Sequence, residues 1–413
     1  MSREFDLVIV GAGITGAVTA GLAVARRLST PARVAIVANR FPADPGADAD
    51  WDLRVYALSR ASERVLRECG AWDEMRADRV YGYERMHVWD ASGAPQGRGS
   101  VSFDCAEIGE PNLGSIVDAR VLQARCLQAA RDAGVVLIEA ALENIVVTDQ
   151  TARIALGDGR ELRCRLIVGA DGTESRTRDL LGIGTAGHAY HQDALVAHVR
   201  TEKPHQGSAW QRFLATGPLA FLPLPDGRSS IVWSTARSEA ARLRGLDSGQ
   251  FGAELTAASG GVFGACELVT PIAGFPLKLQ YALNYVAPSA VLLGDAAHAV
   301  HPLAGQGLNL GLLDCAALAE VLGCAAGAQQ FGDMRLLRRY ERWRKSENLL
   351  AAAAMDGIDR LFSNANPVLA NLRSAGLTAV GQLHFVKRQL ARRALGLSGD
   401  LPSFRADRFS PHR

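Results

Sequence analysis

The chain has 413 residues, a formal net charge of +2 and a hydrophobic fraction of 48%. This length can bury a large core and predicts two intimately joined domains. A charge near neutrality, without a basic stripe, argues against nucleic acid as a partner.

Targeting and redox signals point to the cytoplasm. The seven cysteines are scattered without a C-x-x-C pair, and their odd number favours buried free thiols in a reducing compartment. No apolar run reaches the roughly 18 residues of a membrane span. The charged residues 1–5 lead directly into a strand, which leaves no room for a signal peptide.

The N-terminal segment has the pattern of a dinucleotide-binding unit. Residues 5–10 read as a buried strand, an alanine-rich helix follows to about residue 28, and residues 33–38 form a second strand. The intervening run G-A-G-I-T-G has G-x-G-x-x-G spacing. Gly11 allows the tight turn, Gly13 lets a pyrophosphate approach the backbone, and Gly16 lets helix and strand pack closely.

The middle of the chain alternates between two kinds of pattern. Residues 85–90 and 100–104 alternate like half-buried strands, as do 194–201 and 209–235. We expect the latter pair to form a lid sheet. The helix expected at 118–133 carries Arg120 and Gln123 on one face, because their spacing is i,i+3. The strand expected at 162–170 ends in the turn Asp171-Gly172.

Residues 289–314 carry the most specific pattern. An apolar strand at 290–293 ends in a turn at Gly294 that presents Asp295, and the entry Gly305-Gln306-Gly307 leads into an apolar helix from about Leu308. A helix start leaves backbone N–H groups unpaired, and these favour negative charge. Asp295 supplies a carboxylate acceptor for hydroxyl groups. A flavin has a hydroxyl-bearing chain, which suits Asp295, and a ring that becomes anionic, which suits the helix start.

Other chemistries have weaker support. His298 and His301 could be combined with Asp295 into a metal site, but the adjacent glycine-rich turn has a better explanation, so no metal is predicted. We expect no separate NADPH domain. A G-x-S-x-G hydrolase elbow is also missing from the sequence.

The run H-P-L-A-G-Q-G-L-N-L-G-L-L-D at 301–314 closely resembles the second FAD motif of the UbiH-type ubiquinone-biosynthesis hydroxylases. These are a branch of the single-component FAD aromatic monooxygenases, with a p-hydroxybenzoate-hydroxylase-like fold. The runs L-I-V-G-A-D-G at 166–172, G-P-L-A-F-L-P-L at 217–224 and G-L-S-G-D-L-P at 396–402 are also similar to the family.

This resemblance implies an α/β fold with interleaved domains. A Rossmann-like FAD-binding domain would comprise residues 1–80, 112–183 and 276–330. A mixed β-sheet domain that binds substrate would comprise 81–111 and 184–275, and a helical region would follow at 331–413.

The resemblance also assigns roles to residues. It places Pro302, Gly305, Gln306 and Gly307 at the catalytic centre, and His301, Pro218, Leu219, Phe221 and Pro223 around the substrate. The expected FAD contacts are Gly11, Gly13, Gly16, Asn39, Arg54, Arg120, Gln123, Asp171, Gly172, Gly294, Asp295, Gly305, Gly307, Leu308 and Asn309.

One position departs from the family pattern. The second strand of a Rossmann unit usually ends with an acid that binds the adenosine ribose, and the resemblance puts that position at Ala38. Asn39 is the nearest polar replacement. The missing charge-assisted hydrogen bond corresponds to about 1.5–3 kcal/mol, so we expect FAD to depend more on its other contacts.

The implied activity is hydroxylation of the aromatic ring of a polyprenylated phenol or quinol in ubiquinone biosynthesis. It would use O2, a flavin C4a-hydroperoxide and NAD(P)H as a transient electron donor. A lipophilic substrate implies contact with other ubiquinone-synthesis enzymes or with the inner membrane. Two interpretations stay open for Lys387, Arg388, Arg392 and Arg393: a basic patch on anionic lipid, or an ordinary solvated packing helix.

Two alternative functions remain at this point. The first is a flavin hydroxylase of the same fold that acts on a different, soluble phenol. The second is a non-catalytic member of a ubiquinone-synthesis complex, for which Ala38 is the only support.

Overall fold

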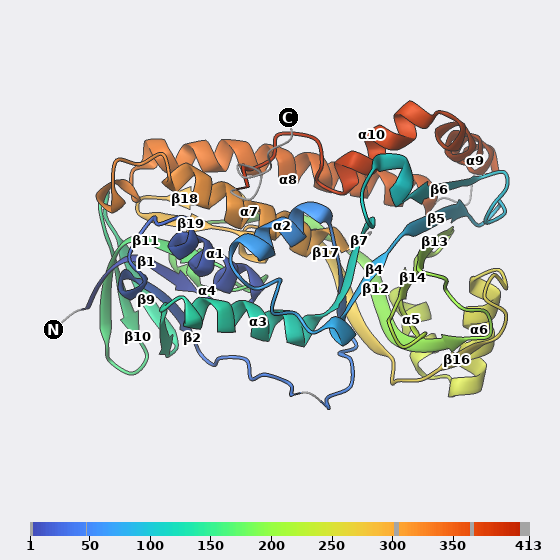
Figure 1. Cartoon of the computed structure of the whole chain (residues 1–413), viewed down its shortest axis with the longest axis horizontal. Coiled ribbons are helices and arrows are strands. Elements are labelled where there is room, and N and C mark those ends of the chain that lie inside the picture. Colours follow the sequence, from blue (N-terminus) through green and yellow to red (C-terminus); the bar gives the residue numbers. More distant parts are fainter. Residues whose placement is uncertain (1–2, 47, 301–304, 364–366, 405–413) are drawn as a thin grey trace.

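The computed structural model describes residues 3–46, 48–300, 305–363 and 367–404, without the side chains of 367–370. Two sheets lie side by side along the long axis of the molecule (Figure 1). The long helix α8 (Met334–Phe362) runs above both and contacts a strand of each. The two predicted domains therefore share one helical cover.

The first sheet has a parallel centre, as the Rossmann pattern predicts. Its parallel strands end at one edge, so the turns at Gly11, Asp171 and Gly294 converge there. An antiparallel hairpin extends the sheet and covers its second face. The strands, in spatial order, are β18 (Val286–Ala287), β19 (Ala290–Leu292), β11 (Glu161–Gly169), β1 (Arg3–Val10), β2 (Val34–Ala38) and β8 (Val136–Glu139), with the hairpin β9 (Leu142–Val147) and β10 (Ala152–Leu156).

Helices cover the opposite face of this sheet. Leu7 and Ile9 point into the core that the helices share, whereas Val8 and Val10 point toward the hairpin. This alternation follows from the two-residue period of a strand. The helices of this half are α1 (Ile14–Ala25), α2 (Arg60–Glu68), α3 (Ala119–Asp132), α4 (Arg176–Leu180) and α7 (Gln306–Leu322).

The second sheet is mixed and lies in the other half of the molecule (Figure 1). One of its faces packs on α5 (Arg237–Arg244) and α6 (Ser248–Ala258) around a core that includes Trp233 and Phe251. Its strands, in order, are β20 (His298–Ala299), β17 (Ala273–Ala282), β12 (Thr185–Thr201), β15 (Ser229–Ala236), β14 (Gly217–Pro223), β13 (Ser208–Leu214), β5 (Arg85–Asp90) and β6 (Ser100–Asp104), with β16 (Cys266–Leu268) beside β12.

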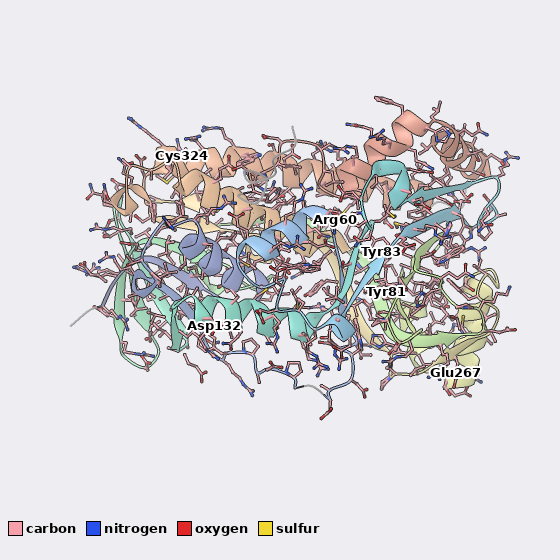
Figure 2. All side chains as sticks on the ribbon, in the orientation of Figure 1. Arg60, Tyr81, Tyr83, Asp132, Glu267 and Cys324 are labelled. Atoms are coloured by element: carbon pink, nitrogen blue, oxygen red, sulfur yellow. The ribbon has the colours of Figure 1, made fainter. Side chains whose placement is uncertain are left out.

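A small antiparallel sheet joins the two halves. It consists of β3 (Val55–Leu58), β7 (Gly114–Asp118) and β4 (Val80–Tyr83). Tyr81 and Tyr83 lie at this junction (Figure 2). The predicted return to the first domain at residue 276 is placed too early, because β17 stays in the second sheet until Ala282.

The C-terminal helices α9 (Pro367–Gln382) and α10 (His384–Ala394) pack against the second half. The Arg373 guanidinium of α9 donates to the Asp90 carboxylate at the end of β5, with Nε 2.5 Å from Oδ2, and both side chains are buried. Lys387 of α10 is also buried and lies 2.6 Å from the carboxylate of Glu107. Ion pairs thus attach both helices to the second half.

A buried carboxylate links the halves at the centre of the molecule. Asp314 of α7 accepts hydrogen bonds from the Gly294 amide at 3.1 Å, from Arg344 Nε at 2.7 Å and from Asn348 Nδ2 at 3.1 Å. His298 Nε2 of β20 lies 2.5 Å from the same carboxylate. Burial alone would raise the pKa of Asp314, but His298 and Arg344 outweigh it and lower the pKa to about 2.

We predict that Asp314→Asn lowers the free energy of unfolding at neutral pH by about 3–5 kcal/mol, because it leaves the buried Arg344 charge without its partner. The folded pKa of Asp314 lies below its ordinary value of 3.8. The stabilisation is therefore present above that pH and is lost as the pH falls toward 2. Urea unfolding at several pH values should show the gap between variant and wild type narrowing below about pH 4.

The control for this experiment is Asp73→Asn, which changes an exposed ion pair with Arg67. It should leave the unfolding free energy nearly unchanged. The predicted ion pairing of Asp314 would be contradicted if Asp314→Asn and wild type had the same unfolding free energy. It would also be contradicted if the difference between them stayed constant as the pH falls.

Candidate active site

A large cavity of ≈ 1490 Å³ lies between the two sheets. Its walls come from the turns at the edge of the first sheet, from the open face of the second sheet, and from α7 and α10. Ligand pockets commonly measure roughly 300–1,000 Å³. The cavity therefore has room for a large cofactor and a second molecule.

The glycines of the first turn differ in what requires them. A Cβ on Gly11 would lie 2.3 Å from the carbonyl oxygen of Ala170, and one on Gly16 would lie 2.0 Å from the carbonyl oxygen of Gly11. The fold itself requires these two glycines. Gly13 has an ordinary φ of −71°, and a Cβ added there would have no atom within 4 Å, yet Gly13 lines the cavity.

The start of α1 at Gly13 suits an anion. No side chain caps this helix, and no acidic residue stands in its first turn. The first backbone N–H groups of a helix lack intrahelical partners, and the helix dipole favours negative charge there. A pyrophosphate close to Gly13 would use these groups.

The end of β2 lies at the cavity without the usual acid. Ala38 and Asn39 both line the cavity. Arg40, which the sequence interpretation missed, also lines it and is exposed. A positive charge therefore stands one residue beyond Asn39, where it can attract a phosphate group.

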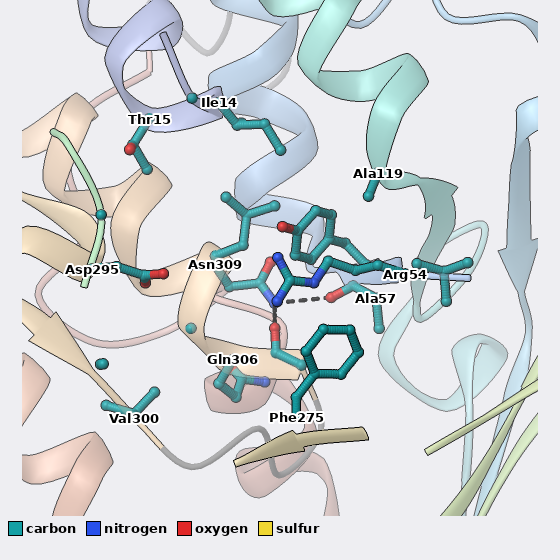
Figure 3. Close-up of a pocket in the computed structure, with 18 of the residues that line it drawn as sticks. Ile14, Thr15, Arg54, Ala57, Ala119, Phe275, Asp295, Val300, Gln306 and Asn309 are labelled. Atoms are coloured by element: carbon teal, nitrogen blue, oxygen red, sulfur yellow. Dashed lines mark hydrogen bonds between the residues drawn. The ribbon is translucent and has the colours of Figure 1, made fainter. Parts of the chain in front are cut away.

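Arg54, Arg120 and Gln123 all line the cavity. The Arg54 guanidinium lies 5.2 Å from the ring centroid of Phe275, which brings the two halves together over the cavity (Figure 3). Arg120 Nη2 donates to the carbonyl of Asp50 at 2.8 Å. Gln123 Nε2 donates to the carbonyl of Ala12 at 3.3 Å, so it also supports the first glycine turn.

The Asp171 carboxylate is engaged within its own turn. It accepts hydrogen bonds from Ser175 Oγ at 2.5 Å, from the Thr177 amide at 2.8 Å and from Thr177 Oγ1 at 2.9 Å. Asp171 and Gly172 do line the cavity. These contacts show that the side chain fastens the turn, so any contact with a cofactor would be additional.

Asp295 points into the cavity (Figure 3). Its side chain is exposed to the cavity, and no described residue hydrogen-bonds to its carboxylate. The surrounding protein desolvates the carboxylate and raises its pKa, which Arg54 partly opposes. Gly294 before it has φ +56° and lies against Thr15 of α1, so the turn and α1 are packed together.

The start of α7 forms another wall of the cavity. Its N-cap, Gly305, has φ +64°, and neither a side-chain cap nor an acid is present in the first turn. Gly305, Gln306, Gly307 and Leu308 all line the cavity. The predicted residues His301 and Pro302 lie outside the described residues.

The Asn309 side chain is saturated by the protein. Its Oδ1 accepts from the Ser59 amide at 2.8 Å and from Ser62 Oγ at 2.6 Å, and its Nδ2 donates to the carbonyls of Ala57 and Gly305 (Figure 3). It therefore joins α7 to β3. Because its side-chain atoms are already hydrogen-bonded within the protein, any contribution of Asn309 to cofactor binding would come from its position at the start of α7.

The predicted substrate wall needs correction in β14. Pro218 lines the cavity, whereas the prediction is wrong for Leu219 and Phe221, which belong to the core on the opposite face, against α5 and α6. Pro223 does not line the cavity either. Successive residues of a strand face opposite sides, so only alternate residues of β14 reach the cavity.

The central strands of the second sheet turn mainly small residues toward the cavity, and three polar side chains, Gln211, Ser230 and Ser234, lie among them. Ser230 is fully buried, and its Oγ has no hydrogen-bond partner among the described residues. Gln211 lies on the same wall. Neither was predicted, although the alternation of these strands carries the signal. The lining residues of β12, β13, β14 and β15 are Ala194, Val196, Ala209, Trp210, Gln211, Pro218, Ala220, Leu222, Ser230, Val232 and Ser234. The flanking strands β5, β6, β17 and β20 add Met86, Phe103, Phe275, Pro276, Leu277, Lys278 and Ala299.

Comparison with known proteins decides the family. A family model described as an FAD binding domain matches residues 4–353. This chain belongs to the FAD-binding monooxygenase family. The 3-demethoxyubiquinol 3-hydroxylase of Escherichia coli is 35% identical over 405 residues, which cover 96% of this chain and 100% of that protein.

Other similarities agree with this family. The ubiquinone hydroxylase UbiL of Rhodospirillum rubrum is 35% identical, over 95% of this chain and 89% of its own. The crystal structure of p-nitrophenol 4-monooxygenase from Pseudomonas putida has a TM-score of 0.74 at 17% identity, and covers 97% of this chain and 99% of its own. That likeness concerns the fold alone.

These results confirm the predicted family, fold class and cofactor. The chain is an FAD-dependent monooxygenase, and the open space at Gly13, the uncapped helix starts and the cavity-facing Asp295 fit FAD. No helix among the described residues is long and apolar enough to cross a membrane. The same part of the chain contains no group of three His, Cys, Asp or Glu side chains that could hold a metal ion.

We predict that Gly13→Val weakens FAD binding while the fold is retained. The added side chain meets no protein atom, but it would occupy space that we assign to the pyrophosphate. Overpacking of this kind costs about 1–3 kcal/mol, and about 1.4 kcal/mol already corresponds to tenfold weaker binding. Fluorescence titration of the apoprotein with FAD measures the dissociation constant.

Gly357→Val is the matched control, because Gly357 of α8 also has open space around a Cβ and does not line the cavity. It should leave FAD affinity unchanged. Equal FAD affinity of Gly13→Val and wild type would show that the pyrophosphate lies elsewhere.

Proposed function

We propose that this enzyme hydroxylates the aromatic ring of a polyprenylated phenol or quinol in ubiquinone biosynthesis. The observation that carries this proposal is the group of small residues that β12, β14 and β15 turn toward the cavity. Alanine, serine, proline and valine side chains leave width for a substituted ring and the beginning of a long apolar chain. The ubiquinone hydroxylases to which the chain is similar support this substrate class.

FAD, when bound and reduced, supplies the electrons that activate O2 for transfer of one oxygen atom to an aromatic ring. The residues of this chain bind and orient the reactants. In the proposal, Gly13 and the start of α1 hold the pyrophosphate, Arg40 and Asn39 lie by the adenosine, and Asp295 accepts from hydroxyl groups. The first turn of α7 directs its N–H groups toward negative charge on the ring system.

The second sheet would exclude water and orient the substrate. Val196, Ala220 and Val232 supply an apolar surface, which limits access of water to the reaction site. Among the polar groups of this wall, the Ser230 hydroxyl, which has no partner among the described residues, and the Gln211 amide are available to a phenol oxygen. A buried hydroxyl without a partner is costly, so a substrate oxygen that pairs with Ser230 gains both affinity and orientation.

The remaining partners follow from the same proposal. NAD(P)H would reduce the flavin and then dissociate. The second G-x-G-x-x-G spacing, at 182–187, leads into strand β12 and not into a helix, so it lacks the context of a dinucleotide-binding turn. A substrate with a polyprenyl tail implies contact with other ubiquinone-synthesis enzymes or with the inner membrane, at whose surface the enzyme would work as a peripheral protein.

The proposal is tested with purified, FAD-loaded enzyme and a short-chain prenylphenol in detergent. We expect NAD(P)H oxidation to be stimulated by the prenylphenol, and isotopically labelled O2 to place one labelled oxygen in the product. Complementation of an Escherichia coli strain without its 3-demethoxyubiquinol 3-hydroxylase adds a test in cells. Turnover of small soluble phenols but not of the prenylphenol would favour a different hydroxylase, and no turnover of either would favour a non-catalytic role.

The orientation of β14 gives a sharper prediction. Ala220 faces the cavity and Leu219 faces the core. Ala220→Phe should therefore raise KM for the prenylphenol at least about tenfold, since overpacking costs about 1–3 kcal/mol, with normal flavin content. Leu219→Ala should instead lower the free energy of unfolding by about 2–5 kcal/mol, with little change in KM. Reversed effects would show that the sheet presents its other face to the substrate.

A further inference from the structure

The cavity reaches the molecular surface beside α10. Ala391 and Leu395 line it from the buried side of the helix, and Leu390 lines it although this residue is 49% exposed. The same leucine thus contacts both the cavity and the outside. Figure 1 shows α10 at the outer edge of the molecule, above the strands of the second sheet.

The outer side of α10 is unusually apolar. Phe385 is 82% exposed, and Leu383, Val386 and Leu390 are exposed at spacing i, i+3, i+7, which places them in one stripe. Leu383 is 56% exposed and Val386 is 37% exposed. The stripe ends at Leu390, next to the cavity. We call Leu383, Phe385, Val386, Arg388 and Leu390 the α10 surface.

The charged residues between 360 and 399 are all basic. No Asp or Glu occurs between Asp359 and Asp400, whereas six Lys or Arg residues do, in a chain with 43 acids among 413 residues. Some of these cations are used internally: Arg373 pairs with Asp90, Lys387 with Glu107, and Arg393 with Glu347. Arg388 is exposed and has no ion pair among the described residues.

We propose that the α10 surface docks on an anionic lipid bilayer, so that a lipophilic substrate enters the cavity directly from the membrane. This proposal rests on the substrate class given above. A helix that combines exposed Phe and Leu with Arg, and that has no acids, suits the interface between headgroups and acyl chains. The geometry differs from a four-residue basic patch, because Lys387 faces inward and four large apolar side chains are exposed beside Arg388.

The occupant is a bilayer because of how charge and apolar area are combined. Acidic lipid attracts Arg388, and the apolar stripe gains by leaving water. Continuity with the cavity adds a reason for this position: a polyprenyl tail could pass along Leu390 without crossing water. A protein partner or a second copy of this chain would need no such continuity.

The test is co-sedimentation of the FAD-loaded, full-length enzyme with vesicles. Wild type should bind vesicles of phosphatidylcholine and phosphatidylglycerol in equal parts more tightly than pure phosphatidylcholine vesicles, and less tightly at high salt. Phe385→Ser should weaken this binding at least about tenfold. Arg388→Gln should weaken it about fivefold, through loss of one basic contact.

Two matched controls change exposed residues elsewhere. Val269→Ser alters an exposed apolar side chain after β16, and Arg153→Gln alters an exposed arginine on β10. Both should bind vesicles like wild type. Failure of wild type to bind the anionic vesicles would overturn the proposal, as would equal losses in the controls. A wild-type dimer that Phe385→Ser converts to a monomer without any change in vesicle binding would assign the surface to a second copy and also overturn it.

Turnover in detergent separates this proposal from the proposed function. The rate with a short-chain prenylphenol in detergent should be the same for Phe385→Ser and wild type, since no bilayer is involved. Vesicle binding by α10 without any prenylphenol turnover would refute the substrate assignment, and the proposal that the α10 surface docks on a bilayer would stand. Prenylphenol turnover without vesicle binding would refute only the proposal that the α10 surface docks on a bilayer.

Discussion

The arrangement of the whole site depends on the buried carboxylate of Asp314. Its contacts reach the Gly294 amide at the edge of the first sheet, His298 at the margin of the second sheet, and Arg344 of α8. An isolated buried charge would be very costly, so these partners must stay in place together. The same contacts fix Asp295 relative to α7 and set one sheet against the other. This ionic centre therefore acts with the three-stranded sheet and α8 in holding the two walls of the cavity at their spacing.

The sequence is most informative where a constraint is local to the backbone. Gly11 and Gly16 are required by close backbone contacts at their own turn, and the turn follows the first strand directly. G-x-G-x-x-G in that context therefore predicts the parallel sheet and its binding edge. Gly13 differs, because nothing in the protein excludes a side chain there. Its presence indicates a ligand, which makes it the most direct functional signal of the three.

The sequence is less informative where the answer depends on distant partners. Asn309 and Asp171 belong to recognised motifs, but their polar atoms are engaged by Ser59, Ser62 and Thr177, and only the folded structure reveals this. The G-P-L-A-F-L-P-L run predicts a strand without saying which alternate residues face the ligand, since both faces are apolar. A prediction from this run alone therefore places Leu219 and Phe221 at the cavity, although both belong to the core on the other face of the sheet. The Asp314 centre joins residues from several elements and leaves no local pattern.

A hydroxylase of a lipophilic ring must satisfy two opposing demands: water has to be kept from the flavin, and a long apolar tail has to enter. A sheet suits the first demand, because its backbone hydrogen bonds are satisfied internally and its small side chains form a continuous wall. A sheet cannot open without breaking those bonds, so entry has to occur at a margin. In the proposed arrangement this margin is formed by α10, which Lys387 anchors to Glu107 on one side while Leu390 remains exposed on the other. A helix with exposed apolar side chains at the opening would keep the surroundings of the tail apolar from the surface to the cavity, while the wall over the flavin would stay closed.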